Sequence, residues 1–126
     1  MIRLHKNEEG AAAVEFSIVA LIFIIFIVGI IEVGRGFHLR NQLVYSLDRA
    51  LRLTYLNQAI SDEALKAAVQ QNFYGAHSSL ISTSIATQSL DGRNYRLITA
   101  TMPFKLFVPA ISSSTLTLSV KRLVPA

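Results

Sequence analysis

The chain contains no cysteine, which excludes disulfide bonds and cysteine-ligated metal sites and leaves the redox compartment open. Proline is also scarce, and none occurs between Ala11 and Pro103. Because proline breaks helices, its absence permits one long helix through the first half of the chain. Charge is sparse as well: charged residues make up 16% of the sequence, and Glu15 is the only ionisable side chain between Ala11 and Ile31.

The segment from Ala11 to Ile31 is rich in isoleucine, valine and phenylalanine. As an α-helix, its roughly 21 residues would span ~31 Å, which matches a bilayer core of roughly 30 Å. A carboxylate within such a span costs a few kcal/mol when it is deep and unpaired. Two interpretations of Glu15 follow from the residues alone: it reaches the headgroups with no further role, or it has a function in the membrane.

The order of features at the N-terminus resembles type IV pilins and pseudopilins. A short polar leader precedes Gly10, four small or apolar residues follow, and Glu15 opens an unbroken apolar helix. With the segments Gly10-Ala-Ala-Ala-Val-Glu-Phe16 and Gly29-Ile-Ile-Glu-Val-Gly-Arg35, roughly the first forty residues resemble TadE/TadF-like minor pseudopilins of tight-adherence (Flp-type) pili. The resemblance implies that prepilin peptidase cuts between Gly10 and Ala11 and leaves the helix on the mature protein.

The resemblance also implies a function. It indicates a minor pseudopilin that takes part in assembling a Tad/Flp-type pilus for adhesion. Its implied partners are prepilin peptidase, other pilins and pseudopilins, the Tad membrane platform and the lipid bilayer. Glu15, with Phe16 beside it, is the implied assembly site, where the carboxylate neutralises the Ala11 amine of a neighbouring subunit and sets register. Major Flp pilins are short, so a head of ~70 residues favours a minor subunit. The position of the subunit in the pilus (tip, shaft or platform) stays open. The TadE or TadF subtype and the methylation of Ala11 also stay open.

The implied location is the bacterial inner membrane, crossed once, with the N-terminus cytoplasmic and the head periplasmic or otherwise extracytoplasmic. Arg3 and Lys6 agree with a cytoplasmic N-terminus, but the four arginines between positions 35 and 52 favour the opposite orientation by the positive-inside rule. The prediction therefore follows the resemblance, because a prepilin cleavage site must face the cytoplasm. Incorporation of the subunit into the pilus is left open.

No catalytic or metal-binding pattern stands out. The three histidines, His5, His38 and His77, have no metal-ligand spacing, and Ser112–Ser114 lack a nucleophile motif. We therefore predict no enzyme activity, no metal and no cofactor. The net charge of +4 lies largely beside the span without interleaved aromatic residues, so no nucleic-acid partner is expected. The alternative function is a single-pass membrane-anchored binding module with no role in a filament.

The predicted fold class is α+β and pilin-like. We expect a leader (residues 1–10), a transmembrane helix (11–31), a helical stem (32–57) and a small head (58–126) with one helix and an antiparallel sheet of about three strands. Apolar spacing predicts helix to about residue 56, with Phe37, Val44, Leu47, Leu51 and Tyr55 on the buried side. Leu43 and Ala50 widen this predicted stripe. Ser61 is the predicted N-cap of the second helix and Gly75 its end.

Alternation of apolar and polar residues predicts a strand at residues 80–90 and a return strand from Tyr95 that stops before Pro103, joined by a turn at Asp91-Gly92. A second turn is predicted at residues 112–114 and a last strand near residues 116–120. Gly29, Gly34 and Gly36 indicate either close helix packing or a bend or melted turn.

Glu32 and Arg35 form a second candidate pair. They are three residues apart and can meet on one helix face, for a few tenths of a kcal/mol when exposed. Glu32 can instead pair with another subunit in an assembly, and the sequence leaves both alternatives open.

Overall fold

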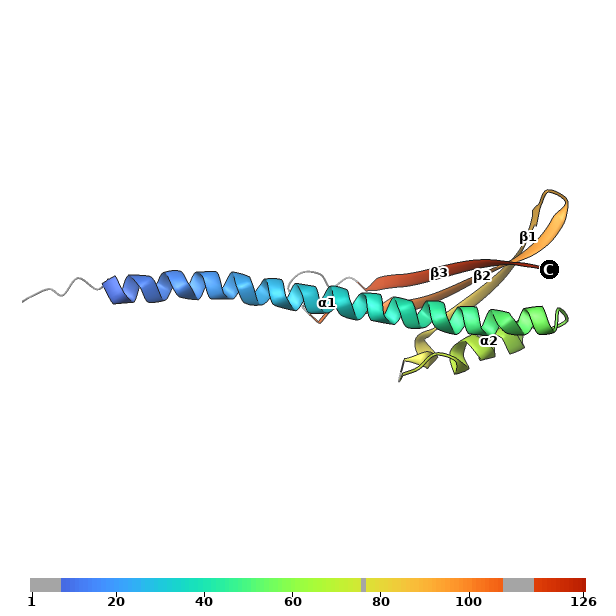
Figure 1. Cartoon of the computed structure of the whole chain (residues 1–126), viewed down its shortest axis with the longest axis horizontal. Coiled ribbons are helices and arrows are strands. Elements are labelled where there is room, and N and C mark those ends of the chain that lie inside the picture. The colour runs from blue at the N-terminus through green and yellow to red at the C-terminus, as the bar shows by residue number, and fades with distance from the viewer. Residues whose placement is uncertain (1–7, 76, 108–114) are drawn as a thin grey trace, which may run out of the picture. The chain divides into compact units, whose positions relative to one another are not determined.

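A computed structural model describes residues 8–75, 77–107 and 115–126. Its elements are, in order, α1 (Glu8–Leu56), α2 (Asp62–Gln71), the 3-10 turn η1 (Ser78–Leu80), β1 (Ser82–Leu90), β2 (Arg93–Phe104) and β3 (Leu116–Pro125) (Figure 1). The long apolar N-terminal helix, the second short helix and the three-stranded antiparallel sheet confirm the predicted α+β class. The chain divides into two compact units, Met1–Gly34 and Arg35–Ala126, with the division inside α1.

Helix α1 extends without interruption from Glu8 to Leu56. The predicted long helix is therefore present, and the alternative of a melted turn at Gly29, Gly34 or Gly36 is wrong. The helix starts three residues earlier than the predicted residue 11. Alanine has the highest helix propensity, and the run Ala11–Ala13 favours extension of the helix toward the N-terminus.

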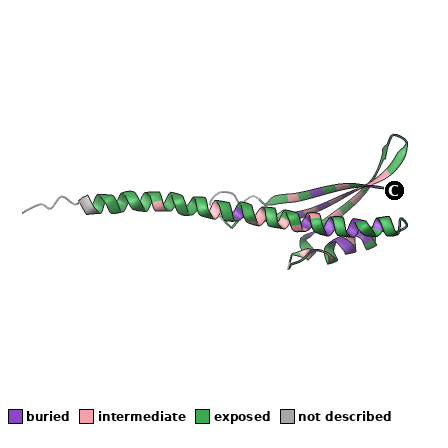
Figure 2. Ribbon diagram, in the orientation of Figure 1, coloured by how far each residue is buried: buried purple, intermediate pink, exposed green. Residues whose placement is uncertain are grey.

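Among the described residues, the apolar core lies in the unit Arg35–Ala126, which we call the head from here on. The second half of α1, α2 and one face of the sheet meet in a single apolar cluster, and Figure 2 shows the buried positions concentrated on these elements. Its fully buried side chains include Leu43, Leu47, Leu65, Val69 and Ile98, each 0% exposed. The head is therefore built around a segment of α1.

The buried face of α1 differs from the predicted stripe at both ends. Phe37 and Tyr55 are 61% and 69% exposed, so these two predictions are wrong. The buried face follows positions 43, 46, 47, 50, 51 and 54, which puts Ser46 and Thr54 inside. Their hydroxyls donate to the carbonyls of residues three positions earlier, over 2.9 Å and 2.6 Å, and this satisfies the polar groups on burial.

Helix α2 begins as predicted and ends earlier. The Ser61 hydroxyl accepts a hydrogen bond from Ala64 N at 3.2 Å, which caps the helix. The last helical residue is Gln71 and the C-cap is Asn72, so the predicted end at Gly75 is wrong. The Asn72 amide donates to Ala68 O at 2.8 Å and satisfies a carbonyl of the last turn, so the helix does not need the glycine as its cap.

The sheet has the order β1-β2-β3, and both pairs are antiparallel. On β2 the buried positions Ile98, Ala100 and Met102 alternate with more exposed ones, so one face of the sheet packs on the helices. The prediction that Pro103 stops β2 is wrong, since β2 continues to Phe104. Proline is tolerated there because β1 begins at Ser82, opposite Thr101, and beyond that point only β3 pairs with β2.

The β1–β2 hairpin turns at Asp91 and Gly92, as the sequence predicts. Both residues have positive φ, 50° and 75°, which is the conformation of a two-residue type I′ turn. From Ala86 to Asn94 every side chain of the hairpin is exposed, so the tip extends beyond the core. The predicted turn at Ser112–Ser114 lies outside the described residues.

Candidate processing site, membrane span and head surface

The predicted cleavage bond lies in the first turn of a helix. Gly10 is the third residue of α1, and Gly10 and Ala11 are both exposed. The first four N–H groups of a helix have no partner within it, so a first turn opens at lower cost than a helix interior. The bond between Gly10 and Ala11 is thus at the part of α1 that is most easily unwound for a peptidase. Cleavage itself stays a prediction.

Glu15 and Phe16 are presented outward on α1. Glu15 is exposed and the Phe16 side chain is 73% exposed. Glu15 lies four residues after Ala11, so the two are one helical turn apart, ~6 Å along the axis. The Glu15 carboxylate and Ala11 therefore lie on the same side of the helix. Their role in assembly stays a prediction.

The apolar part of α1 has the character of a membrane span. Its best 18-residue window has a mean hydropathy of 3.0, and none of that window is buried within the chain. Fourteen large apolar side chains between positions 14 and 33 are 40–73% exposed: Val14, Phe16, Ile18, Val19, Leu21, Ile22, Phe23, Ile24, Ile25, Phe26, Ile27, Ile30, Ile31 and Val33. Soluble monomers rarely expose so large a contiguous apolar surface. The helix is thus a candidate span, in agreement with the predicted anchor.

Ser17 is a polar residue in this span whose fit the sequence did not reveal. Its hydroxyl donates to Ala13 O at 2.7 Å, within the same helix. A hydroxyl that is satisfied by its own backbone needs no water, so Ser17 lowers the cost of the span relative to an unpaired polar group. Glu15 is the only charged residue of this segment.

Arg35 has contacts in the head that sequence reasoning missed. Its guanidinium carbon lies 4.5 Å from the centre of the Phe104 ring and 4.6 Å from that of Phe107. It also donates a hydrogen bond to the backbone carbonyl of Lys105. These cation–π contacts and this hydrogen bond connect residues about 70 positions apart in the sequence, and they stabilise the end of β2 against α1. The predicted pairing of Arg35 with Glu32 stays a prediction.

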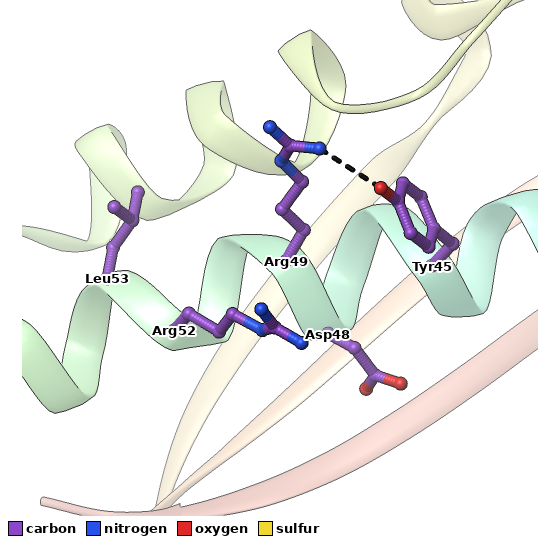
Figure 3. Close-up of a pocket in the computed structure, with 5 residues that line it drawn as sticks. All are labelled: Tyr45, Asp48, Arg49, Arg52 and Leu53. Atoms are coloured by element: carbon purple, nitrogen blue, oxygen red, sulfur yellow. Dashed lines mark hydrogen bonds between the residues drawn. The ribbon is translucent and has the colours of Figure 1, made fainter.

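The exposed face of α1 in the head carries a polar hollow of about 420 Å³ (Figure 3). Tyr45, Asp48, Arg49, Arg52 and Leu53 line it, and all come from α1. Arg49 Nη1 donates to the Tyr45 hydroxyl at 3.0 Å; this bond and the charges of Tyr45 and Tyr74 raise the pKa of Arg49 above its ordinary value. The Arg49 guanidinium therefore stays charged at physiological pH, and no acid–base chemistry follows from it.

Two ion pairs connect the sheet to the helices of the head. Arg122 on β3 donates to Asp48 at 2.9 Å, and both side chains are between 40% and 50% exposed. Arg96 on β2 lies 3.9 Å from Asp62 and also donates to Ile60 O at 3.2 Å. Exposed pairs of this kind contribute at most about 1 kcal/mol each. They orient the sheet on the helices and offer no reactive group.

Metal binding gains no support from the described residues. Over residues 8–75, 77–107 and 115–126, no three histidine or acidic side chains gather into a metal-binding group. His38 contacts Gln42 at 3.0 Å on the surface of α1, and His77 precedes η1. The prediction of no enzyme activity stays a prediction.

A single apolar helix with one carboxylate near its start, continued into a small α+β head, is the architecture that the resemblance to pseudopilins implied. Residues 10–52 match the family model for TadE-like proteins, so the chain is TadE-like over this segment. The predicted resemblance is thereby confirmed for residues 10–52. The matched segment contains the predicted cleavage site, the span and the α1 part of the head core. No curated protein and no solved structure matches the chain.

Proposed function

We propose that the protein is a minor pseudopilin of a Tad/Flp-type pilus, cut by prepilin peptidase after Gly10 and anchored by α1 with its head on the extracytoplasmic side. It is a substrate of that peptidase and a structural subunit for adhesion, and it is not an enzyme. The observation that carries the proposal is Glu15: one exposed carboxylate, five residues after Gly10, on a helix segment that is otherwise apolar.

The proposed mechanism is electrostatic. Cleavage frees the α-amine of Ala11, which becomes a positive charge at the end of the apolar helix. In a bundle of such helices, Glu15 of one subunit neutralises the Ala11 amine of a neighbour. Two unit charges 4 Å apart attract by about 4 kcal/mol at an effective dielectric of 20. Because desolvation offsets much of this attraction, the pair sets the register of subunits more than it adds stability.

Substitution of Glu15 tests this mechanism. Glu15→Ala and Glu15→Gln should leave cleavage and membrane insertion intact, since removal of a carboxylate lowers the transfer cost of the span. Both should reduce co-purification of the processed subunit with other pilus components and reduce the number of pili per cell. Glu15→Gln keeps size and hydrogen bonding, so a loss with glutamine as well as alanine assigns the effect to charge.

Glu63→Gln is the matched control. Glu63 is an exposed carboxylate of α2 in the head, and its neutralisation should leave assembly unchanged. Normal piliation and co-purification with both Glu15 variants would contradict the proposal and favour the membrane-anchored binding module.

A further inference from the structure

The head contains a second hollow, of about 340 Å³, at the start of its α1 segment. Its apolar floor consists of five side chains from α1, η1 and β2, among them Leu39 and Pro103. Its rim carries the basic residues Arg35, His77 and Lys105. The volume is at the lower end of the ~300–1,000 Å³ of small-molecule sites. An apolar floor with a basic rim matches an amphiphile that has an anionic end.

The charge of the rim is one-sided. No acidic side chain is among the residues that line this hollow. The sequence stretches next to its lining residues, position 76 and positions 108–114, contain no charged residue either. Arg35 is held by the rings of Phe104 and Phe107, while Lys105 is exposed. The rim therefore offers the Lys105 ammonium group to an anionic group that arrives from outside.

The hollow is close to the membrane along the chain. Arg35, which belongs to its lining, follows the last residue of the apolar span, Ile31, by four positions. Four residues reach at most about 14 Å even when fully extended. A group attached at this distance from a membrane span is within reach of the lipid headgroups. Phe107, 76% exposed, adds an apolar side chain of the kind that interfacial segments bury at the boundary between headgroups and acyl chains.

We propose that this hollow binds an anionic phospholipid of the membrane that anchors α1. The lipid phosphate lies against Lys105 and His77, and the glycerol and the first methylenes of an acyl chain cover the apolar floor at Leu39 and Pro103, which are half-buried and exposed, respectively. The bound lipid holds the base of the head at the membrane surface. The inference rests on the membrane anchoring by α1 in the proposed function, and it needs neither cleavage nor pilus assembly.

The absence of cysteine allows a specific test, because one introduced cysteine gives one labelling site in the full chain. Leu80→Cys places a fluorophore at the hollow, and Leu90→Cys places it at the hairpin tip; both leucines are 47% exposed and so form a matched pair. Phe26→Cys, at a position 67% exposed in the span, reports membrane insertion. Each labelled full chain is reconstituted into bilayer nanodiscs that contain a trace of quencher-labelled phosphatidylglycerol or phosphatidylcholine.

The Leu80→Cys label should be quenched about fivefold more strongly by phosphatidylglycerol than by phosphatidylcholine, as expected for one basic side chain near an anionic lipid. The Leu90→Cys label should show no such preference. The double change Lys105→Gln and His77→Gln should abolish the preference at Leu80→Cys, while Arg93→Gln, at the hairpin tip, should leave it unchanged. Soluble inorganic phosphate at matched ionic strength should not compete, because it cannot occupy the apolar floor.

Equal quenching by the two lipids at Leu80→Cys would overturn the inference. Quenching at Phe26→Cys without quenching at Leu80→Cys would also overturn it, and would leave the membrane anchor of the proposed function intact. No quenching at Phe26→Cys would contradict the anchor itself. Excimer emission between two pyrene-labelled Leu80→Cys chains, in place of lipid quenching, would assign the hollow to a second copy and refute the lipid.

Discussion

Replacing Leu47 with alanine tests whether α1 is a structural part of the head as well as a span. Leu47 is 0% exposed and belongs to the cluster that joins α1, α2 and the sheet. Leucine-to-alanine changes at such sites cost about 2–5 kcal/mol, from lost transfer energy and the cavity left behind. A unit the size of the head has a free energy of unfolding of about 5–14 kcal/mol. Leu47→Ala should therefore remove a large share of its stability.

The expected readout is a lower unfolding midpoint of the head. At roughly 4–8 °C per kcal/mol for a domain of this size, the melting temperature should fall by at least about 10 °C. The measurement is proteolysis of the full chain in detergent micelles across a temperature or urea series. Leu53→Ala is the control: Leu53 lies on the same helix but is 38% exposed, so its loss should cost less than about 1 kcal/mol. Equal losses in the two variants would refute the proposed packing of α1 in the head.

Two further changes test local structure in the head. Ser61→Ala removes the hydroxyl that caps α2 and should cost about 0.5–2 kcal/mol of unfolding free energy, measured by urea denaturation; no loss would mean that the cap is dispensable. Gly92→Val should destabilise the hairpin by about 1–2 kcal/mol, because Gly92 has φ +75° and a side chain is strained there. Amide exchange at the tip should accelerate in Gly92→Val, and unchanged exchange would contradict the observed turn.

The features that the sequence predicted correctly depend on local chemistry. The N-cap at Ser61 and the turn at Asp91-Gly92 follow from the preferences of a few adjacent residues, and the structure contains both. The unbroken helix α1 follows from the absence of proline and from its apolar composition. The TadE-like resemblance is likewise carried by a contiguous segment, residues 10–52.

The features that were missed depend on contacts between distant segments. Phe37 and Tyr55 fit a helical stripe, but α2 and the sheet cover a face of α1 that is rotated away from them. Pro103 is compatible with β2 only because the pairing of β2 with β1 extends no further than Thr101, which no local pattern indicates. The contact of Arg35 with Phe104 joins residues far apart in the sequence, so the basic hollow at this position was not predictable from composition.

Intact mass of the protein from membranes with and without an active prepilin peptidase tests the central claim most directly. The account predicts that the peptidase removes residues Met1 to Gly10 and leaves Ala11 as the new N-terminus. In the peptidase-free membranes the chain should keep these residues. Gly10→Leu should slow the cut strongly, because a bulky residue does not fit beside the scissile bond, whereas Gly10→Ala should be tolerated better. An unchanged mass in the presence of the peptidase, or normal cleavage of Gly10→Leu, would contradict the account.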